Sequence, residues 1–376
     1  MVKREVQLIQ SHVNACVVAL ISGRVHLSIM IMGTQARHMR FRIPMWPSRT
    51  RLAATLLVVA IALGLGLTLQ GCAMQMRPRI SAGRSIPEPA EFYAMYELDF
   101  PVSRRDTNYL SCSCASSSEE PPYQIAVHEF HPLSASNAGT VVVVHGYLSH
   151  TGHLSYLIRR LSEHGYSILA IDLPGHGLSS GRPGGIDDFG EYANCLQAVH
   201  AYGVEESFPA PYFGIGFSTG GAAFLELLGQ GYGEYYTRIA LASPLIRFRG
   251  YPLLPPLAAA FRQVIPQIPT DDSDPLAART MPLSWVVAAN RYAVRIERAL
   301  PNSAEVLILQ GNQDDIVAWR HNLSVLEAFL PGSKVHILTD GRHELYRRRA
   351  HRREAFLRTL VFFEYGNLSL AAYQHP

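Results

Sequence analysis

The sequence predicts an α/β domain built on a doubly wound, mostly parallel sheet. After residue 95, short runs rich in β-branched residues alternate with segments of helical periodicity. Several of these runs are apolar throughout, as strands must be when helices cover both faces of their sheet. The expected strands are 123–130, 140–145, 167–172, 212–217, 238–242, 305–310 and 334–338. The expected helices are 154–164, 189–202, 220–228, 321–329 and 349–365.

The composition excludes several classes of protein. With 376 residues, of which 48% are apolar, the chain can bury one large core and carry an appendage. There are 33 Lys and Arg against 30 Asp and Glu, so no overall charge points to a nucleic-acid partner. Five cysteines are too few for a disulfide framework, and none pairs with histidines at zinc-site spacing. A disulfide from Cys112 or Cys114 to Cys195 and free thiols both remain open.

The N-terminal part contains an export signal. Residues 53–69 are apolar without a charge and follow Arg49 and Arg51, which is the charge-then-apolar order of a secretory signal. The run ends at residues 69–72 (LQGC), which resemble the lipobox of bacterial lipoproteins, where the cysteine, here Cys72, is acylated. An uncleaved membrane anchor is the alternative, because 17 apolar residues are at the lower limit for spanning a bilayer. Either way, we expect an N-terminal membrane tether.

The first residues do not fit a signal peptide. Arg24 and His26 interrupt the apolar stretch within residues 1–44. The start is therefore open between Met1 and Met45: a start at Met45 would make 1–44 upstream sequence from a wrong start assignment. We expect 45–71 to be the lipoprotein signal peptide.

The expected mature protein consists of a linker and one domain. Residues 72–94 contain Arg, Pro and Ser without periodicity and are predicted to be a linker, and 95–376 to be the domain. Ala73 stands where, in the lipoprotein pattern, an aspartate retains the protein in the inner membrane. The expected location is the bacterial cell envelope, and the outer membrane if the source is Gram-negative.

A nucleophilic serine is predicted at Ser218. Residues 216–220 (GFSTG) match the nucleophile-elbow pattern, directly after an apolar strand and at the start of a helix. The sharp turn raises the serine hydroxyl above the sheet, and glycines flank it because a side chain there would strike neighbouring backbone. The alternative is a glycine-rich turn without chemistry. A phosphate-binding loop is disfavoured, since no lysine follows at its spacing.

Acyl transfer through serine also needs donors for the oxyanion that develops on the carbonyl. The amide of Thr219 at the helix N-terminus is one candidate, and the amide of Tyr147, in the loop after the strand TVVVVH, is the second. His145 ends that strand and is expected to be buried and bonded to backbone.

The acid and the base are expected at two later strand ends, in that order along the chain. Asp314 and Asp315 follow the strand EVLILQ, and spacing alone leaves both open as the acid. His343 follows the last strand and is the expected base, whereas His336 lies within that strand, where core packing explains it better.

These motifs resemble the monoglyceride lipase and lysophospholipase group of α/β hydrolases, named after serine aminopeptidases. The resemblance covers about residues 122–364 and is carried by the blocks VVVVHGYLSHTGH, IDLPGHGLSSGRPGGIDDF, GIGFSTGG and LILQGNQDDIV with GRHEL. It implies the α/β-hydrolase fold with Ser218 as nucleophile, Asp314 as acid by its GxxD spacing, and His343 as base. It also implies that the Tyr147 and Thr219 amides form the oxyanion hole. Tyr147 departs from the small residue frequent in the mammalian enzymes, so the shape of the acyl pocket is open.

An insertion at about 244–301 is expected to form a helical cap, placed before the strand that carries the acid. Its apolar runs either line an acyl-chain channel or pack the cap onto the core. Near the C-terminus an arginine cluster is either a solvated helix face or a surface for anionic headgroups. The cluster comprises Arg347, Arg348, Arg349, Arg352 and Arg353.

The sequence thus predicts a serine carboxylester hydrolase that acts on monoacylglycerol or lysophospholipid-like esters through an acyl-enzyme. The resemblance implies no cofactor and no metal. Acyl transfer or amide cleavage by the same triad is one alternative, and an inactive envelope-binding lipoprotein is another.

Overall fold

The computed structural model describes one domain of the chain. Compact packing divides the chain into Met1–Pro78 and Arg79–Pro376, and every described residue belongs to the second unit. The described residues are 87–113, 122–134, 138–251, 258, 267–269, 274–278 and 280–366. The expected extension (1–44), the signal peptide (45–71) and Cys72 lie outside them, and their assignments stay predictions. Among the described residues, no helix is both long and apolar enough to cross a membrane.

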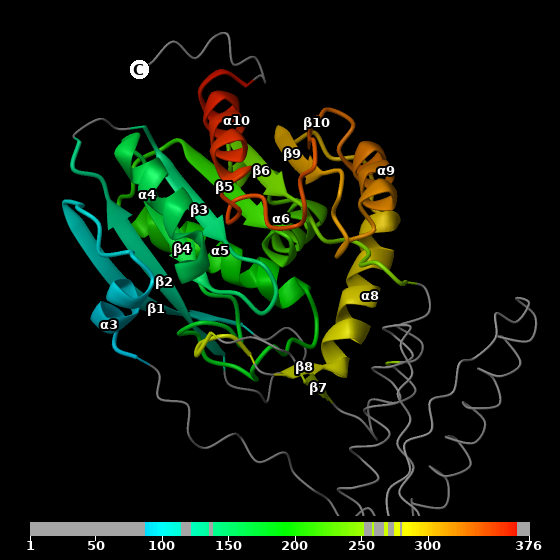
Figure 1. Cartoon of the computed structure of the whole chain (residues 1–376), viewed down its shortest axis with the longest axis horizontal. Helices are drawn as coiled ribbons and strands as arrows, with labels where there is room; N and C mark the ends of the chain where they lie inside the picture. The colour runs from blue at the N-terminus through cyan, green and yellow to red at the C-terminus, as the bar shows by residue number, and fades with distance from the viewer. Residues whose placement is uncertain are drawn as a thin grey trace, which may run out of the picture. The chain divides into compact units, whose positions relative to one another are not determined.

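An eight-stranded sheet forms the centre of the domain (Figure 1), in the order β1-β2-β4-β3-β5-β6-β9-β10. β2 pairs antiparallel with both β1 and β4, and all other neighbours are parallel. The strands are β1 Arg104–Cys112, β2 Tyr123–His131, β3 Thr140–Val144, β4 Ser167–Ile171, β5 Tyr212–Phe217, β6 Arg238–Ala242, β9 Val306–Gly311 and β10 Lys334–Leu338.

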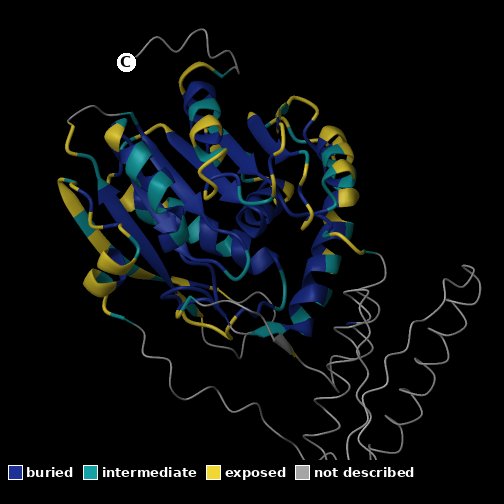
Figure 2. Ribbon diagram, in the orientation of Figure 1, coloured by how far each residue is buried: buried dark blue, intermediate teal, exposed yellow. Residues whose placement is uncertain are grey.

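Helices cover both faces of this sheet, because its central strands are apolar on both sides. In β3, Val142 and Val144 join one apolar core, whereas Val141 and Val143 join the core on the opposite face. The first core includes α5 Gly190–Glu205, α6 Thr219–Gly229, α8 Leu283–Glu297 and α9 Trp319–Phe329. The second includes α3 Pro89–Met95, α4 Ser155–Glu163 and α10 Arg352–Tyr365. The inner strands are accordingly buried throughout (Figure 2).

The predicted fold class is confirmed, and each expected strand and helix is present with ends shifted by a few residues. The sequence did not indicate β1, whose residues are polar and half exposed. β1 is the edge strand beyond β2, and an edge strand covered on one side only lacks the continuous apolar pattern by which buried strands are recognised.

The expected linker boundary is wrong. Helix α3, Pro89–Met95, lies inside the segment 72–94, and its Phe92 and Tyr93 are buried in the second core. The Tyr93 hydroxyl also donates to the carbonyl of Asp106 at 2.7 Å, which ties the helix to β1. Two buried aromatic side chains in one short helix explain why the domain begins before residue 95.

A disulfide joins Cys112 at the end of β1 to Cys195 in α5, with the two Cα atoms 5.1 Å apart. This decides between the alternatives left open for these two cysteines, and Cys114 lies outside the described residues. The link fixes the edge strand to a helix of the first core. It closes a long loop, since the two residues are 83 apart in sequence.

The insertion between β6 and β9 follows the expected position of the cap. Its described parts are a two-stranded sheet, β7 Gln267–Pro269 with β8 Thr280–Pro282, and helix α8. The apolar side of α8 packs into the first core, which favours packing over channel lining for most of its residues. Ion pairs add to this contact: Arg295 lies 2.7 Å from Asp188, and Arg247 lies 2.6 Å from Glu297.

We predict that Cys112→Ala with Cys195→Ala lowers the free energy of unfolding by about 4 kcal/mol, because the crosslink restricts a long loop in the unfolded chain. Denaturant unfolding of the variant, compared with wild type in reductant and without it, measures this. The variant and the reduced wild type should agree. Equal midpoints for oxidised wild type and variant would show that the disulfide contributes nothing.

Candidate active site

The turn between β5 and α6 places Ser218 at the carboxyl end of the sheet. Ser218 has φ 51° and ψ −106°, a conformation that side-chain-bearing residues rarely adopt. The two flanking glycines are required by close backbone approach. A Cβ on Gly216 would lie 2.6 Å from the carbonyl oxygen of Gly220, and a Cβ on Gly220 would lie 2.3 Å from that of Val144. The sequence therefore builds a turn that only glycine permits at these positions.

Three predicted side chains meet at this edge of the sheet. His343 Nε2 lies 3.0 Å from Ser218 Oγ, and His343 Nδ1 lies 2.8 Å from Asp314 Oδ2. Ser218 follows β5, Asp314 follows β9, and His343 follows β10, so three parallel strands deliver the three groups to one end. Ser218 and Asp314 are both buried, and His343 is half-buried. The arrangement is that of a nucleophile, a general base and the carboxylate that orients the base.

Asp314 accepts hydrogen bonds from backbone amides and from Gln310, in addition to its contact with His343. Its Oδ1 accepts hydrogen bonds from the amides of Ile316 and Val317 at 3.0 and 3.1 Å, and its Oδ2 accepts one from Gln310 Nε2. Burial acts to raise the pKa of Asp314, but the bond and charge of His343 and the two amides outweigh it and bring that pKa below its ordinary value. The carboxylate therefore stays ionised at neutral pH.

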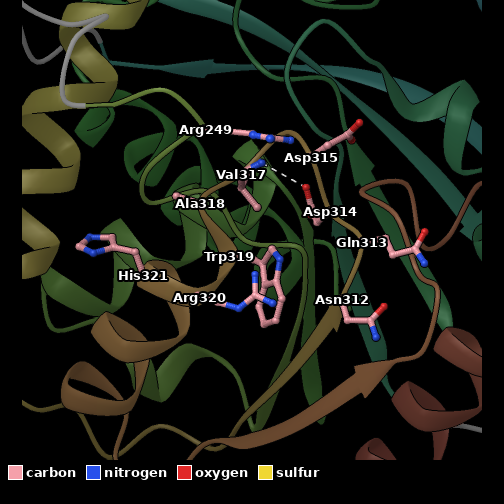
Figure 3. Close-up of a pocket in the computed structure, with 10 residues that line it drawn as sticks. All are labelled: Arg249, Asn312, Gln313, Asp314, Asp315, Val317, Ala318, Trp319, Arg320 and His321. Atoms are coloured by element: carbon pink, nitrogen blue, oxygen red, sulfur yellow. Dashed lines mark hydrogen bonds between the residues drawn. The ribbon is translucent and has the colours of Figure 1, made fainter. Parts of the chain in front are cut away.

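Asp315, the other candidate for the acid, is exposed, and Figure 3 shows its carboxylate directed away from the bond between Asp314 and Val317. We call residues 312–318 the acid loop. A surface cavity of about 440 Å³ lies against it, lined in part by Asp314, Asp315 and Trp319 (Figure 3). Neither Ser218 nor His343 lines this cavity, so it is separate from the position where a substrate would meet the serine.

Two other histidines are accounted for by local contacts. His145 is buried and bonded to backbone as expected: its Nδ1 lies 2.7 Å from the Gly146 carbonyl, and its Nε2 accepts from the Leu173 amide at 2.9 Å. Burial, helped by the nearby His176, lowers the pKa of His145 to about 3, so the ring is neutral. The prediction that His336 packs in the core is wrong. It lies on the edge strand β10, where its Nε2 is 2.8 Å from the carboxylate of Glu354.

The two amides predicted as oxyanion donors belong to Thr219, which follows Ser218 in the chain, and to Tyr147, which follows Gly146. Thr219 is the first residue of α6, and the amides of a helix's first turn have no partner within the helix. Gly146 approaches so closely that a Cβ on it would lie 3.3 Å from the Cβ of Ser218. Tyr147 follows in a tight turn, closed by the bond from the Ser149 amide to the Gly146 carbonyl. We call residues 145–150 the oxyanion loop.

The side chain of Tyr147 joins the oxyanion loop to the cap. Its ring stacks on Trp285 of α8 with centroids 3.8 Å apart, and its hydroxyl donates to the Gly184 carbonyl at 2.7 Å. The bulky residue that departs from the family pattern therefore forms part of the wall between the serine and the cap.

The sequence did not single out Asp172 as a structural group. This buried carboxylate follows β4 and accepts hydrogen bonds from the amides of Thr151 and Leu178 at 2.7 and 2.9 Å. Its Oδ2 also lies 3.2 Å from His128 Nε2. Burial acts to raise the pKa of Asp172. The charge and hydrogen bond of His128, together with other nearby histidines, outweigh burial and lower this pKa below its ordinary value. Asp172 thus fixes the chain just after the oxyanion loop.

A second group that the sequence did not indicate joins the cap to the same loop. His150 Nε2 and His153 Nε2 lie 3.2 and 2.9 Å from Asp274 Oδ2. Metal ions are commonly held by His, Cys, Asp and Glu side chains. Within the described ranges, these three residues are the one group of that kind whose ligand atoms lie close enough together to hold a metal. The amide of Gly152 donates to His150 Nδ1, so the proton of that ring resides on Nε2 and points at Asp274. The cluster is therefore hydrogen-bonded, and its tautomer does not suit a metal ligand.

Comparison with known proteins agrees with this architecture. Residues 135–271 match the family model described as serine aminopeptidase, S33. The monoacylglycerol lipase of Paleococcus ferrophilus superposes with a TM-score of 0.55 at 19% identity, over 64% of this chain and 98% of that one. The chain has the α/β-hydrolase fold.

Two named relatives are similar to the chain in part of their length. Phospholipase YtpA of Bacillus subtilis is 32% identical over 107 residues, which is 28% of this chain and 40% of that protein. A protein of monkeypox virus named monoglyceride lipase homolog is 32% identical over 120 residues, 32% of this chain and 43% of that protein. The chain therefore matches less than half the length of each.

We predict that the protein loses about 3 to 4 kcal/mol of stability between pH 7 and pH 5, since a neutral buried histidine excludes a proton that the unfolded chain binds. Burial lowers the pKa of His145 to about 3 and, with the charges of His150 and Arg347, that of His153 to about 4. Their stabilisation is complete above the unfolded pKa of about 6.5 and is lost as the pH falls. Urea unfolding over this pH range measures it, and His145→Gln should show about half the loss. A free energy of unfolding that is flat with pH would contradict the assignment.

Proposed function

We propose that the hydrolase cleaves carboxylic esters of monoacylglycerols or lysophospholipids by way of an acyl-enzyme. The hydrogen-bonded line from Ser218 through His343 to Asp314 carries this proposal. It lies at the carboxyl ends of parallel strands. The backbone amides of Tyr147 and Thr219, in the neighbouring turns, are the proposed hydrogen-bond donors to the oxyanion that develops in the reaction.

In the proposed reaction, Ser218 Oγ attacks the ester carbonyl carbon while His343 Nε2 takes its proton. The amides of Tyr147 and Thr219 donate to the oxyanion, and each such donor contributes about 3 kcal/mol to lowering the barrier. Asp314 keeps His343 in the required tautomer and stabilises its charged form. The histidine then protonates the leaving alcohol, and water, activated by the same base, releases the fatty acid.

Three observations support a lipid-like ester as the substrate. The relatives include proteins named phospholipase and monoglyceride lipase homolog. Helix α8 of the cap has an apolar side, and its Trp285 stacks on Tyr147, the residue after Gly146, on which a Cβ would lie 3.3 Å from the Cβ of Ser218. Neither group offers a charge that would select an ionic acyl chain.

We also propose that Cys72 is acylated and anchors the hydrolase in the bacterial cell envelope. The lipobox-like residues 69–72 support this, although they lie outside the described part of the chain. The disulfide between Cys112 and Cys195 agrees with export, because disulfides persist in oxidising compartments and are rare in the cytosol of mesophiles.

We predict that Ser218→Ala lowers kcat on a short p-nitrophenyl ester by roughly a million-fold, since the triad acts as a unit. A fluorophosphonate probe should label wild type and not the variant. Labelling of neither protein would favour a binding module over an enzyme. A panel of monoacylglycerols, lysophospholipids, amides and acceptor alcohols separates hydrolysis from acyl transfer and amide cleavage.

We predict that Asp314→Asn lowers kcat by about 10⁴-fold, because the amide holds the histidine in the wrong tautomer. Asp315→Asn is the matched control, one residue away and exposed, and should leave kcat within about twofold. Steady-state kinetics on the same soluble ester measures both. Equal losses in the two variants would contradict the assignment of the acid.

A further inference from the structure

The segment 342–353 differs in charge from the rest of the domain, and we call it the arginine segment. It holds six arginines and one acidic residue, Glu344. From residue 87 to the end, the chain has 22 Lys and Arg against 29 Asp and Glu, so the part outside this segment has 16 Lys and Arg against 28 Asp and Glu and a negative net charge. The six arginines are Arg342, Arg347, Arg348, Arg349, Arg352 and Arg353.

Most of this positive charge is exposed and unneutralised. The side chains of Arg347 and Arg348 are 36% and 50% exposed, and both lie near the single carboxylate of Glu344. Arg342, Arg349 and Arg353 are exposed as well, and none of the three forms an ion pair with another described residue. Arg352 alone lies against an aromatic ring, that of Tyr156.

The arginine segment is a fixed part of the surface, since it is anchored from below. Leu345 and Tyr346 are buried, and the Tyr346 hydroxyl is 2.7 Å from Thr359 Oγ1 in α10. Backbone bonds from Arg348 to Glu344 and from Arg352 to Arg348 continue into the first turn of α10. The exposed arginines are thereby held together on one side of the domain.

This surface borders the active site. His343 lies within the arginine segment, which connects β10 to α10 at the carboxyl edge of the sheet (Figure 1). The acid loop is at the same edge, because its Asp314 contacts His343, and its Ile316 is a 54% exposed apolar side chain. Cationic and apolar groups are therefore exposed beside the triad.

We propose that the arginine segment docks the hydrolase on an anionic lipid membrane, with the edge that carries the triad toward the bilayer. The proposal rests on the proposed function, since a lipid-like ester resides in that membrane. Anionic lipids attract clustered arginines and repel the acidic remainder of the domain, which orients the molecule. An N-terminal tether alone would hold the domain near the membrane without selecting a face.

The test uses the full-length chain inserted by its anchor into vesicles of phosphatidylcholine alone or mixed with phosphatidylglycerol. The rate on a monoacylglycerol embedded in the vesicle is divided by the rate on a soluble short-chain ester. The test variant carries Arg348→Ala together with Arg349→Ala. The control variant carries Arg104→Ala together with Arg298→Ala and therefore loses the same charge. Both control arginines are exposed: Arg104 lies in β1, and Arg298 directly follows α8. All proteins should hydrolyse the soluble ester equally.

We expect anionic lipid to raise this ratio on the order of tenfold for wild type and control, and not for the double arginine-segment variant. Salt at about 1 M should abolish the gain, because the Debye length falls to about 3 Å. An unchanged gain in the variant would overturn the proposal. If wild type hydrolyses no ester, the proposed function is wrong, and docking is then tested by a second measurement.

That second measurement is trypsin cleavage after residues 347–349. Anionic vesicles should slow it on the order of tenfold relative to neutral vesicles, while cleavage after Arg298 stays unchanged. Equal cleavage on both vesicles would overturn the docking proposal independently of activity. Protection by a soluble polyanion such as heparin, with none by anionic vesicles, would also overturn it, because the partner would then be a polyanion.

Discussion

The close approach of helix α6 to the end of strand β3 is the constraint on which the site depends. Gly220 lies so near the carbonyl of Val144 that no side chain fits between them. The oxyanion loop begins directly after Val144, so the same contact brings that loop beside Ser218. One backbone packing therefore positions the nucleophile and both candidate oxyanion donors before any side chain is considered.

Two carboxylates hold the loops that this packing brings together. Asp172 is buried and binds two amides and a histidine, and the partly buried Asp274 contacts two histidines of the chain around the oxyanion loop. A buried charge is costly unless each of its oxygens is paired, and Asp172 meets that condition. Their bonds make the loop between β3 and α4 rigid, as a preorganised donor site requires.

The cap is joined both to the core and to the oxyanion loop. Helix α8 is joined to the core by the ion pair from Arg295 to Asp188 and to the oxyanion loop by the stack of Trp285 on Tyr147. Outside the cap, the arginine segment carries a net charge opposite to that of the rest of the chain from residue 87 on. Catalytic groups, cap and charged surface thus converge on the edge where the parallel strands end.

The sequence by itself determined the order of strands and helices, the elbow at Ser218, and the strand ends that carry Asp314 and His343, because these depend on local patterns. Spacing could not separate Asp314 from Asp315, and that choice came from the family resemblance. The tertiary structure alone decided contacts between distant segments: the pairing of Cys112 with Cys195, the edge position of β1, and the link from Asp274 to His150. Such contacts depend on how separate elements pack, and no local periodicity records them.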